Sequence, residues 1–267
     1  MSVLYSFHNN PNIRRIREMP AIFLYLYSMK RFFFPILPAC AAALLLAASC
    51  RGPVSDAVVW TAGDHPEVLE TFGAPKSFST PLGPAVHFDG QDDAVWLDSV
   101  PVLGLEAFTL EVIFRQESDA PFEQRFLHIG TMDRRILFET RVTPQQTWYF
   151  DAFVNLGTPE ATPDNPKPER RSAVLIDEAL QHPTARWYAL ALTASPEGLV
   201  SYVDGVEQCR SALPWEPLVD EGFTSVGVRQ NQVCWFKGDI FKIRITPRVL
   251  EPKDFLRDHE TLNATGQ

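Results

Sequence analysis

Three aspartates lie within five positions in the stretch HFDGQDDAVWL, which runs from His87 to Leu97: Asp89, Asp92 and Asp93. Such a group could bind calcium, because hard cations prefer several oxygen ligands. It could also serve acid–base chemistry or form a turn, because aspartate side chains bond nearby backbone groups. Asp92 and Asp93 are neighbours, so they point to opposite sides of a regular strand. The pattern favours a hairpin turn between two strands. Calcium is the one candidate ion, and we expect no other cofactor.

A second acidic group contains Glu117, Asp119 and Glu123. Glycoside hydrolases use paired carboxylates, and residues of equal parity share one face of a strand. Pro121 interrupts this stretch, however, and proline is excluded from central strands. We interpret the group as a solvated turn. The chain contains no nucleophile elbow, no HExxH and no glycine-rich phosphate loop, so no catalytic residue is expected, although an enzyme stays an open alternative.

Aromatic residues that leave the core could bind a sugar, since binding sites combine apolar rings with a few polar groups. Trp215 lies between two prolines in LPWEP and is expected in a loop outside the central core. Trp235 is a second candidate. Both rings could instead pack the edges of the fold, and that alternative stays open.

The stretch QTWYFDAFVNL has the alternation of a strand. One face is uniformly apolar and is expected to join the core; it carries Trp148, Phe150, Ala152 and Val154. The other face mixes aromatic and polar residues and is expected to form a concave glycan-binding surface; it carries Tyr149, Asp151, Phe153 and Asn155.

Residues 29–49 resemble a secretory signal. From Met29 the chain reads MKRFFFPILPACAAALLLAASC, with a basic start, an apolar run and small residues before Cys50. This resembles a bacterial lipobox, in which the signal is removed and the cysteine is acylated. We expect a misassigned extension at 1–28, a lipoprotein signal at 29–49 and a linker at 50–56. A genuine cytoplasmic extension and a single membrane span are the alternatives.

The charge of the exported part limits its partners. Of 24 basic and 33 acidic residues, five basic and one acidic residue precede Cys50, which leaves 19 basic, 32 acidic and a net charge of −13. Nucleic-acid binding needs a basic face, so nucleic acid is excluded as a partner. Neutral glycans suit this charge, whereas anionic polysaccharides would need a local basic patch or a metal.

Four cysteines occur in the chain, and two of them, Cys209 and Cys234, lie in the expected domain. An oxidising compartment would allow them to form a disulfide. Two free thiols are the alternative.

Short alternating runs punctuated by Gly, Pro, Asp and Asn fill the rest of the chain, for example FTLEVIFR, RWYALALTA and FKGDIFKIRITP. Helical spacing is brief, at 176–182 and 250–259. The stretch 157–171 holds four prolines and must be a long surface loop. In YVDGVEQ, Asp204-Gly205 fits a two-residue hairpin turn. Trp187 in RWYALALT is expected in the core. These patterns predict an all-β fold of two antiparallel sheets.

The order of GPAVHFDGQDDAVWL, FTLEVIFR, RWYALALTASPEGLVSYVDGVEQ and FKGDIFKIRITPRVLEPKDF resembles the laminin-G-like domain of the concanavalin A-like lectin/glucanase superfamily. The resemblance implies a jelly-roll sandwich over about 57–260 with a short C-terminal helix. It also implies several functions, because one fold hosts many. We expect a carbohydrate-binding or adhesion module for a polysaccharide or glycoconjugate. It would be exported and lipid-anchored to the membrane of a bacterial envelope, in the periplasm or at the surface. The alternatives are a glycoside hydrolase or polysaccharide lyase, and an envelope protein-interaction domain.

Overall fold

The computed structural model describes residues 57–219 and 221–266 of the chain. The expected extension, signal and linker, with the lipidation candidate Cys50, lie outside the described residues. Within them, no helix is long and apolar enough to cross a membrane.

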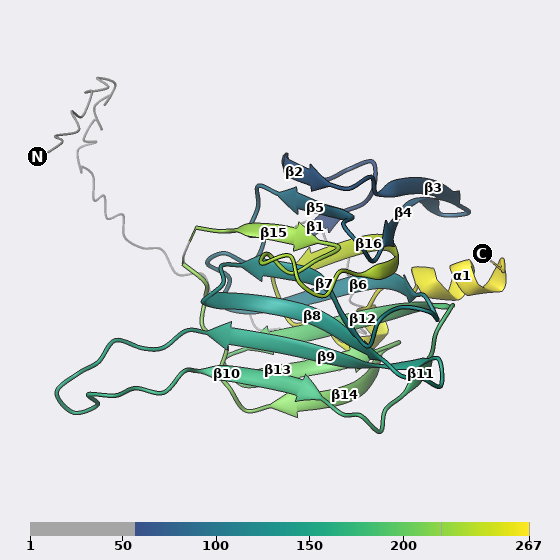
Figure 1. Ribbon diagram of the computed structural model, residues 1–267. Helices are drawn as coiled ribbons and strands as arrows, with labels where there is room; N and C mark the ends of the chain where they lie inside the picture. Colours follow the sequence, from purple (N-terminus) through teal and green to yellow (C-terminus); the bar gives the residue numbers. More distant parts are fainter. Residues whose placement is uncertain (1–56, 220, 267) are drawn as a thin grey trace, which may run out of the picture. The chain divides into compact units, whose positions relative to one another are not determined.

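In the described residues, sixteen strands form two antiparallel sheets of eight strands each, which confirms the expected sandwich (Figure 1). The first sheet has the order β14-β13-β12-β6-β16-β4-β3, and β1 pairs with the other end of β16. Its strands are β1 (Val58–Trp60), β3 (Lys76–Thr80), β4 (Gly83–Asp89), β6 (Phe108–Gln116), β12 (Trp187–Ser195), β13 (Gly198–Val203), β14 (Val206–Ser211) and β16 (Lys237–Thr246).

The second sheet has the order β10-β9-β8-β7-β15-β5-β2, and β11 pairs with β9. Its strands are β2 (Val68–Phe72), β5 (Ala94–Leu97), β7 (Glu123–Gly130), β8 (Arg134–Val142), β9 (Thr147–Leu156), β10 (Ser172–Ile176), β11 (His182–Pro183) and β15 (Phe223–Val226).

The main core lies between the two sheets and follows the alternation of each strand. On β6, for example, Phe108, Leu110, Val112 and Phe114 belong to this core. Aromatic rings fill its centre, where Phe114 stacks on Phe126 with ring centroids 5.2 Å apart. The opposite side of each strand therefore forms an outer face of the sandwich.

The C-terminal segment packs on the outer face of the first sheet. It contains the short 3-10 helix η1 (Pro252–Asp254) and the helix α1 (Asp258–Ala264). Leu262 of α1 packs with the buried rings of Trp187 and Phe241, and Leu250 and Phe255 pack together with residues of β12 and β13. The short helix was expected. The core position of Trp187 is also confirmed, although its cluster lies outside the main core. We call this outer face the covered face.

Two turn predictions have different outcomes. The Asp204-Gly205 turn is confirmed, since both residues have positive φ (50° and 78°) between the paired strands β13 and β14. The hairpin expected around Asp89 is wrong. There the chain crosses from β4 in the first sheet to β5 in the second, so the two flanking strands are not partners.

The long loop at 157–171 is confirmed between β9 and β10, and Figure 1 shows it extending beyond the sheets. Helical spacing at 176–182 was misleading, because this stretch forms a turn. The carboxylate of Asp177 accepts a hydrogen bond from the backbone N–H of Ala179, which stabilises the turn instead of a helix.

Candidate functional site

The outer face of the second sheet carries the polar side chains of β7, β8 and β9, and we call it the open face. On β9, Trp148, Phe150, Ala152 and Val154 lie in the core. The alternate residues Tyr149, Asp151, Phe153 and Asn155 lie outside that core cluster and belong to the open face, as the alternation predicted.

Strand register places charged residues of three strands side by side. Glu139 on β8 lies directly opposite Asp151 on β9, and Arg125 on β7 lies opposite Glu139. Arg135 and Arg141 share the parity of Glu139 and therefore the same face. None of these β7 and β8 residues was singled out from the sequence. The alternation of RRILFETRV, applied as it was to β9, would have found three of them.

Arg141 links the two acids of the open face. One guanidinium nitrogen lies 2.7 Å from an oxygen of Glu139, and another donates a 2.7 Å hydrogen bond to Asp151. Arg125 lies 3.4 Å from Glu139 and pairs more closely with Glu123. The five side chains form one ion network, in which two arginines face three acids.

Asp151 is the most perturbed acid of this network. The residue is 4 % exposed, and burial raises the pKa of its carboxyl from 3.8 to about 6, although the charge of Arg141 opposes the shift. Its Oδ1 atom is buried without a hydrogen-bond partner in the described residues. A buried acceptor without a partner carries a desolvation penalty that a ligand donor would remove.

A hollow of about 270 Å³ lies over this network. We call it the arginine groove. Its walls contain Arg125, Arg141, Arg135 and Arg229, the two acids Glu139 and Asp151, and the apolar residues Leu137, Phe153 and Val174. The combination of a concave surface, an aromatic ring and convergent polar groups is typical of a ligand site.

A second aromatic group lies on the open face at strands β2, β5 and β15. Trp96 contacts Phe72 and Phe223, with ring centroids 4.6 and 4.7 Å apart, and Trp235 meets the edge of Phe72 at 6.4 Å. All four rings are half-buried. We call these rings the aromatic patch. Trp235, a candidate from the sequence, therefore belongs to a half-buried group of rings on this face.

The remaining sequence candidates have structural roles. Trp215 is 2 % exposed, belongs to the main core and donates its indole N–H to the carbonyl of Leu105 at 2.8 Å. The expectation that Trp215 lies outside the central core is wrong, because its loop folds inward against Phe108. Asn155 is fully buried and bonds the backbone of Asp133 and Gly157. Tyr149 is also buried, at 5 % exposure, opposite Arg141.

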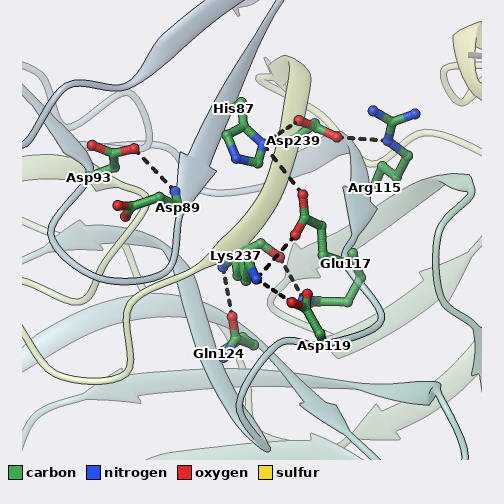
Figure 2. Close-up of polar contacts among 10 residues, drawn as sticks. His87, Asp89, Asp93, Arg115, Glu117, Asp119, Gln124, Lys237 and Asp239 are labelled. Carbon is green, nitrogen blue, oxygen red and sulfur yellow. Dashed lines mark hydrogen bonds and ion pairs between the residues drawn. The ribbon is translucent and has the colours of Figure 1, made fainter.

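The aspartate group at the β4–β5 crossing bonds its own backbone. Asp93 is 4 % exposed and accepts a hydrogen bond from the N–H group of Ala74 at 2.7 Å. It accepts another from the N–H group of Asp89 at 3.1 Å (Figure 2). Asp89 accepts one from Gln91 at 2.8 Å. One carboxylate oxygen from each of the three aspartates lies within 4.8 Å of the others. These bonds indicate that the three aspartates stabilise the tight crossing of the chain from one sheet to the other.

A separate polar network lies on the first sheet, near the end of β4 that leads into this crossing (Figure 2). Buried Asp239 accepts a 2.7 Å bond from Arg115 and lies 2.9 Å from Nδ1 of His87. Lys237 pairs with Asp119 at 2.6 Å and with Glu117 at 3.5 Å. Glu123, by contrast, begins β7 and pairs with Arg125. The three acids of the second sequence group therefore do not converge on one site.

The two cysteines of the domain are free, which contradicts the expected disulfide. Cys209 lies on β14 of the first sheet and packs against the main core. Cys234 lies in the loop after β15, where its carbonyl bonds the backbone N–H of Arg125 on the second sheet. An even number of cysteines in an exported chain suggested the pair, but that number carries no information on whether the two residues are neighbours in the fold. Burial raises the pKa of both thiols.

Comparison with known proteins agrees with the fold. A laminin-G family model, described as "Concanavalin A-like lectin/glucanases superfamily", matches residues 89–254. A search of curated proteins finds no significant match.

Similar solved structures include domain 4 of an extracellular arabinanase from Geobacillus stearothermophilus, in complex with arabinotriose (14 % identity, 74 % of this chain, 84 % of that chain, TM-score 0.43). A pentraxin from Limulus polyphemus has 10 % identity over 63 % of this chain and 77 % of that chain, with a TM-score of 0.46. The binding domain of a paraclostridial mosquitocidal protein has 7 % identity over 75 % of this chain and 48 % of that chain, with a TM-score of 0.49. At these identities the likeness concerns the fold alone.

Proposed function

The chain belongs to the concanavalin A-like lectin/glucanases superfamily, and from this membership we propose that its open face binds carbohydrate. The observation that carries the proposal is the arginine groove, where Phe153 and Asp151 lie among several hydrogen-bond donors. An aromatic ring supplies an apolar contact for a sugar ring, and the charged groups can bond its hydroxyls. The aromatic patch lies on the same sheet and would extend the contact along a longer chain.

A glycan array followed by calorimetry tests this proposal. We expect a glycan to bind, and we expect Phe153→Ala to weaken its binding about fivefold, because one well-placed aromatic contact contributes on the order of 1 kcal/mol. Phe78→Ala is the matched control. Phe78 is also half-buried and also faces an arginine, Arg115, but it lies on the first sheet. Equal losses in the two variants, or no binding at all, would contradict a glycan site in the groove.

Glycoside hydrolysis is the second candidate function. Glu139 and Asp151 lie opposite each other on adjacent strands, and the pKa of about 6 leaves Asp151 partly protonated near neutral pH. One acid could donate a proton to the leaving oxygen while the other attacks or activates water. Arg141 bonds both acids, however, which suits a binding role as well. Release of reducing ends that is abolished in Asp151→Asn would favour the enzyme.

If the protein neither binds nor cleaves glycans, contact of the open face with another envelope protein becomes the better explanation. A pull-down from envelope extract with the protein and with Trp235→Ala would test that third function. A partner that is retained equally by both proteins would exclude the aromatic patch as the contact.

We propose in addition that the protein is exported and held at the membrane by a lipid on Cys50. The support is the basic start, apolar run and small residues that precede this cysteine. Intact mass measurement of the membrane-extracted protein should give a chain that begins at Cys50 with added acyl groups. Cys50→Ser should release the protein into the soluble fraction. A mature protein that retains residues 1–49 would contradict the anchor.

A further inference from the structure

Two of the four groove arginines are left without an acidic partner. Arg125 and Arg141 form ion pairs with Glu123, Glu139 and Asp151. Among the described residues, Arg135 and Arg229 form no ion pair.

Arg135 is the more buried of these two cations. It is 6 % exposed, donates a hydrogen bond to the carbonyl of Met132 and lies 5.0 Å from the ring centre of Phe153. The Nε atoms of both Arg135 and Arg229 are buried and have no hydrogen-bond partner in the described part of the chain. Donors of this kind carry a desolvation penalty until an acceptor reaches them.

Like charges gather around this point. The pKa of Arg135 is lowered to about 10, first by burial and then by the charges of Arg229 and Arg170. Arg170 belongs to the loop at 157–171, and the next residue, Arg171, donates a 2.6 Å hydrogen bond to Glu216, which ties down that end of the loop. Of these three cations, Arg135 and Arg229 line the groove itself.

The loop that carries Arg229 is held by hydrogen bonds to the sheet. His128 is fully buried, donates from Nε2 to the carbonyl of Thr131 and accepts at Nδ1 from the backbone N–H of Gln230. The Gln230 side chain donates to the carbonyls of Gly130 and Phe223 at 2.9 and 3.0 Å. These bonds fix the position of Arg229 before any ligand arrives, which lowers the entropy lost on binding.

We propose that the arginine groove selects acidic glycans, with the anionic group of one sugar, a carboxylate or a sulfate ester, bound between Arg135 and Arg229 beside Phe153. This inference rests on the proposed carbohydrate binding and names its ligand class. A guanidinium group suits such anions because its paired N–H donors can bond two oxygens of a planar carboxylate or of a tetrahedral sulfate. The exported part of the chain has a net charge of −13, which repels polyanions, so an acidic ligand would need a local basic patch. Arg135 and Arg229 supply such a patch in the groove.

Calorimetry with two matched ligand pairs tests the inference: oligogalacturonate against its methyl ester, and a sulfated galactan oligosaccharide against its desulfated form. We expect an acidic member to bind at least about tenfold more tightly than its neutral form, and salt to weaken it. The pair that shows the difference identifies carboxylate or sulfate as the anion.

Arg229→Gln and Arg135→Gln should each weaken binding of the acidic form far more than binding of the neutral form, which removes most of that preference. Arg229 is only half-buried, so its variant keeps the test valid if Arg135→Gln fails to fold. Arg210→Gln is the control, because Arg210 is exposed on β14 and pairs with Glu207. Equal binding of neutral and acidic forms would overturn the acidic selectivity while carbohydrate binding stands. Absence of all binding would overturn both, and an acidic preference that survives both variants would place the anion elsewhere.

Discussion

The two outer faces of the sandwich have the same strand geometry but different surroundings. On the covered face, the C-terminal segment buries Trp187 and Phe241 under Leu262. On the open face, no helix or strand of the described residues covers Arg141, Asp151 and Phe153, and they line a hollow instead. Burial of an outer face under another segment stabilises the fold, whereas an uncovered face keeps its charged and aromatic groups available for a ligand.

Charged groups sharpen this contrast. On the covered face, Glu111 is 1 % exposed, and its two oxygens are used by Arg244 at 2.6 Å and by the backbone N–H of Leu256 at 2.7 Å. On the open face, one oxygen of Asp151 has no hydrogen-bond partner among the residues that the structure describes. The buried carboxylate of the covered face is thus fully bonded, whereas that of the open face keeps an oxygen that a ligand donor could reach.

Trp187→Ala should produce the largest effect, on the covered face. Trp187 is fully buried, and replacing a buried aromatic residue with alanine costs about 3 to 5 kcal/mol of unfolding free energy. Glycan affinity should be unchanged in the folded fraction. Urea unfolding and calorimetry measure the two quantities. A loss of affinity without a loss of stability would remove the distinction between the faces.

Glu111→Gln should cost about 3 kcal/mol of unfolding free energy, since removing one partner of a buried ion pair leaves the other charge uncompensated. Glu207→Gln is the control. Its pair with Arg210 is exposed, and exposed pairs contribute little. Chemical denaturation of both variants at neutral pH compares them. Similar losses in both would contradict the structural role of the covered ion pair.

Asp151 gives the open face a pH dependence that can be isolated with Asp151→Asn. Its pKa is about 6 in the folded protein against 3.8 ordinarily, so the folded state binds more protons between these values. The stability that results is present below about pH 4 and is lost as the pH rises through 6. From pH 4 to 8 the wild type should lose up to about 3 kcal/mol relative to the variant, at about 1.4 kcal/mol per pKa unit.

His128 changes stability in the opposite direction and would obscure this effect in the wild type alone. Burial lowers its pKa to about 4, so the unfolded state binds the proton first and stability is lost as the pH falls below about 6.5. Because His128 is present in both proteins, its contribution cancels in the difference. A difference that does not change with pH would contradict the raised pKa of Asp151.

Trp235→Ala tests whether the aromatic patch belongs to the same surface as the groove. Long oligosaccharides should lose about twofold to tenfold in affinity, since an aromatic contact contributes about 0.5 to 1.5 kcal/mol. Short oligosaccharides that fill only the groove should bind as before. Calorimetry with oligosaccharides of increasing length compares these two affinities. Equal effects at all lengths would indicate that Trp235 acts on the groove itself.

Calcium should have the smallest effect. Both oxygens of Asp93 already accept backbone hydrogen bonds, and Asp89 bonds the same turn. We expect calcium to shift the melting temperature by less than about 1 °C, far below the shift of roughly 2 to 4 °C that 1 kcal/mol gives in a domain of this size. A larger shift that Asp92→Ala abolishes would establish a metal site.

The alternation of β9 determined from sequence alone which residues face the core and which face outward. Period-two geometry requires this wherever one side of a strand is buried. The Asp204-Gly205 turn was equally accessible, because few residues adopt positive φ at two successive positions. Both features depend on residues close together in the chain.

The tertiary structure decided which strands are neighbours and what covers each face. Only the pairing of β7, β8 and β9 brings Arg125, Glu139 and Asp151 into one network, and only the path of the C-terminal segment leaves that face open. Trp215 was misjudged for the same reason, since the burial of a loop ring depends on distant chain segments. Local sequence specifies the direction of a side chain, whereas its partners are set by contacts between residues far apart in the chain.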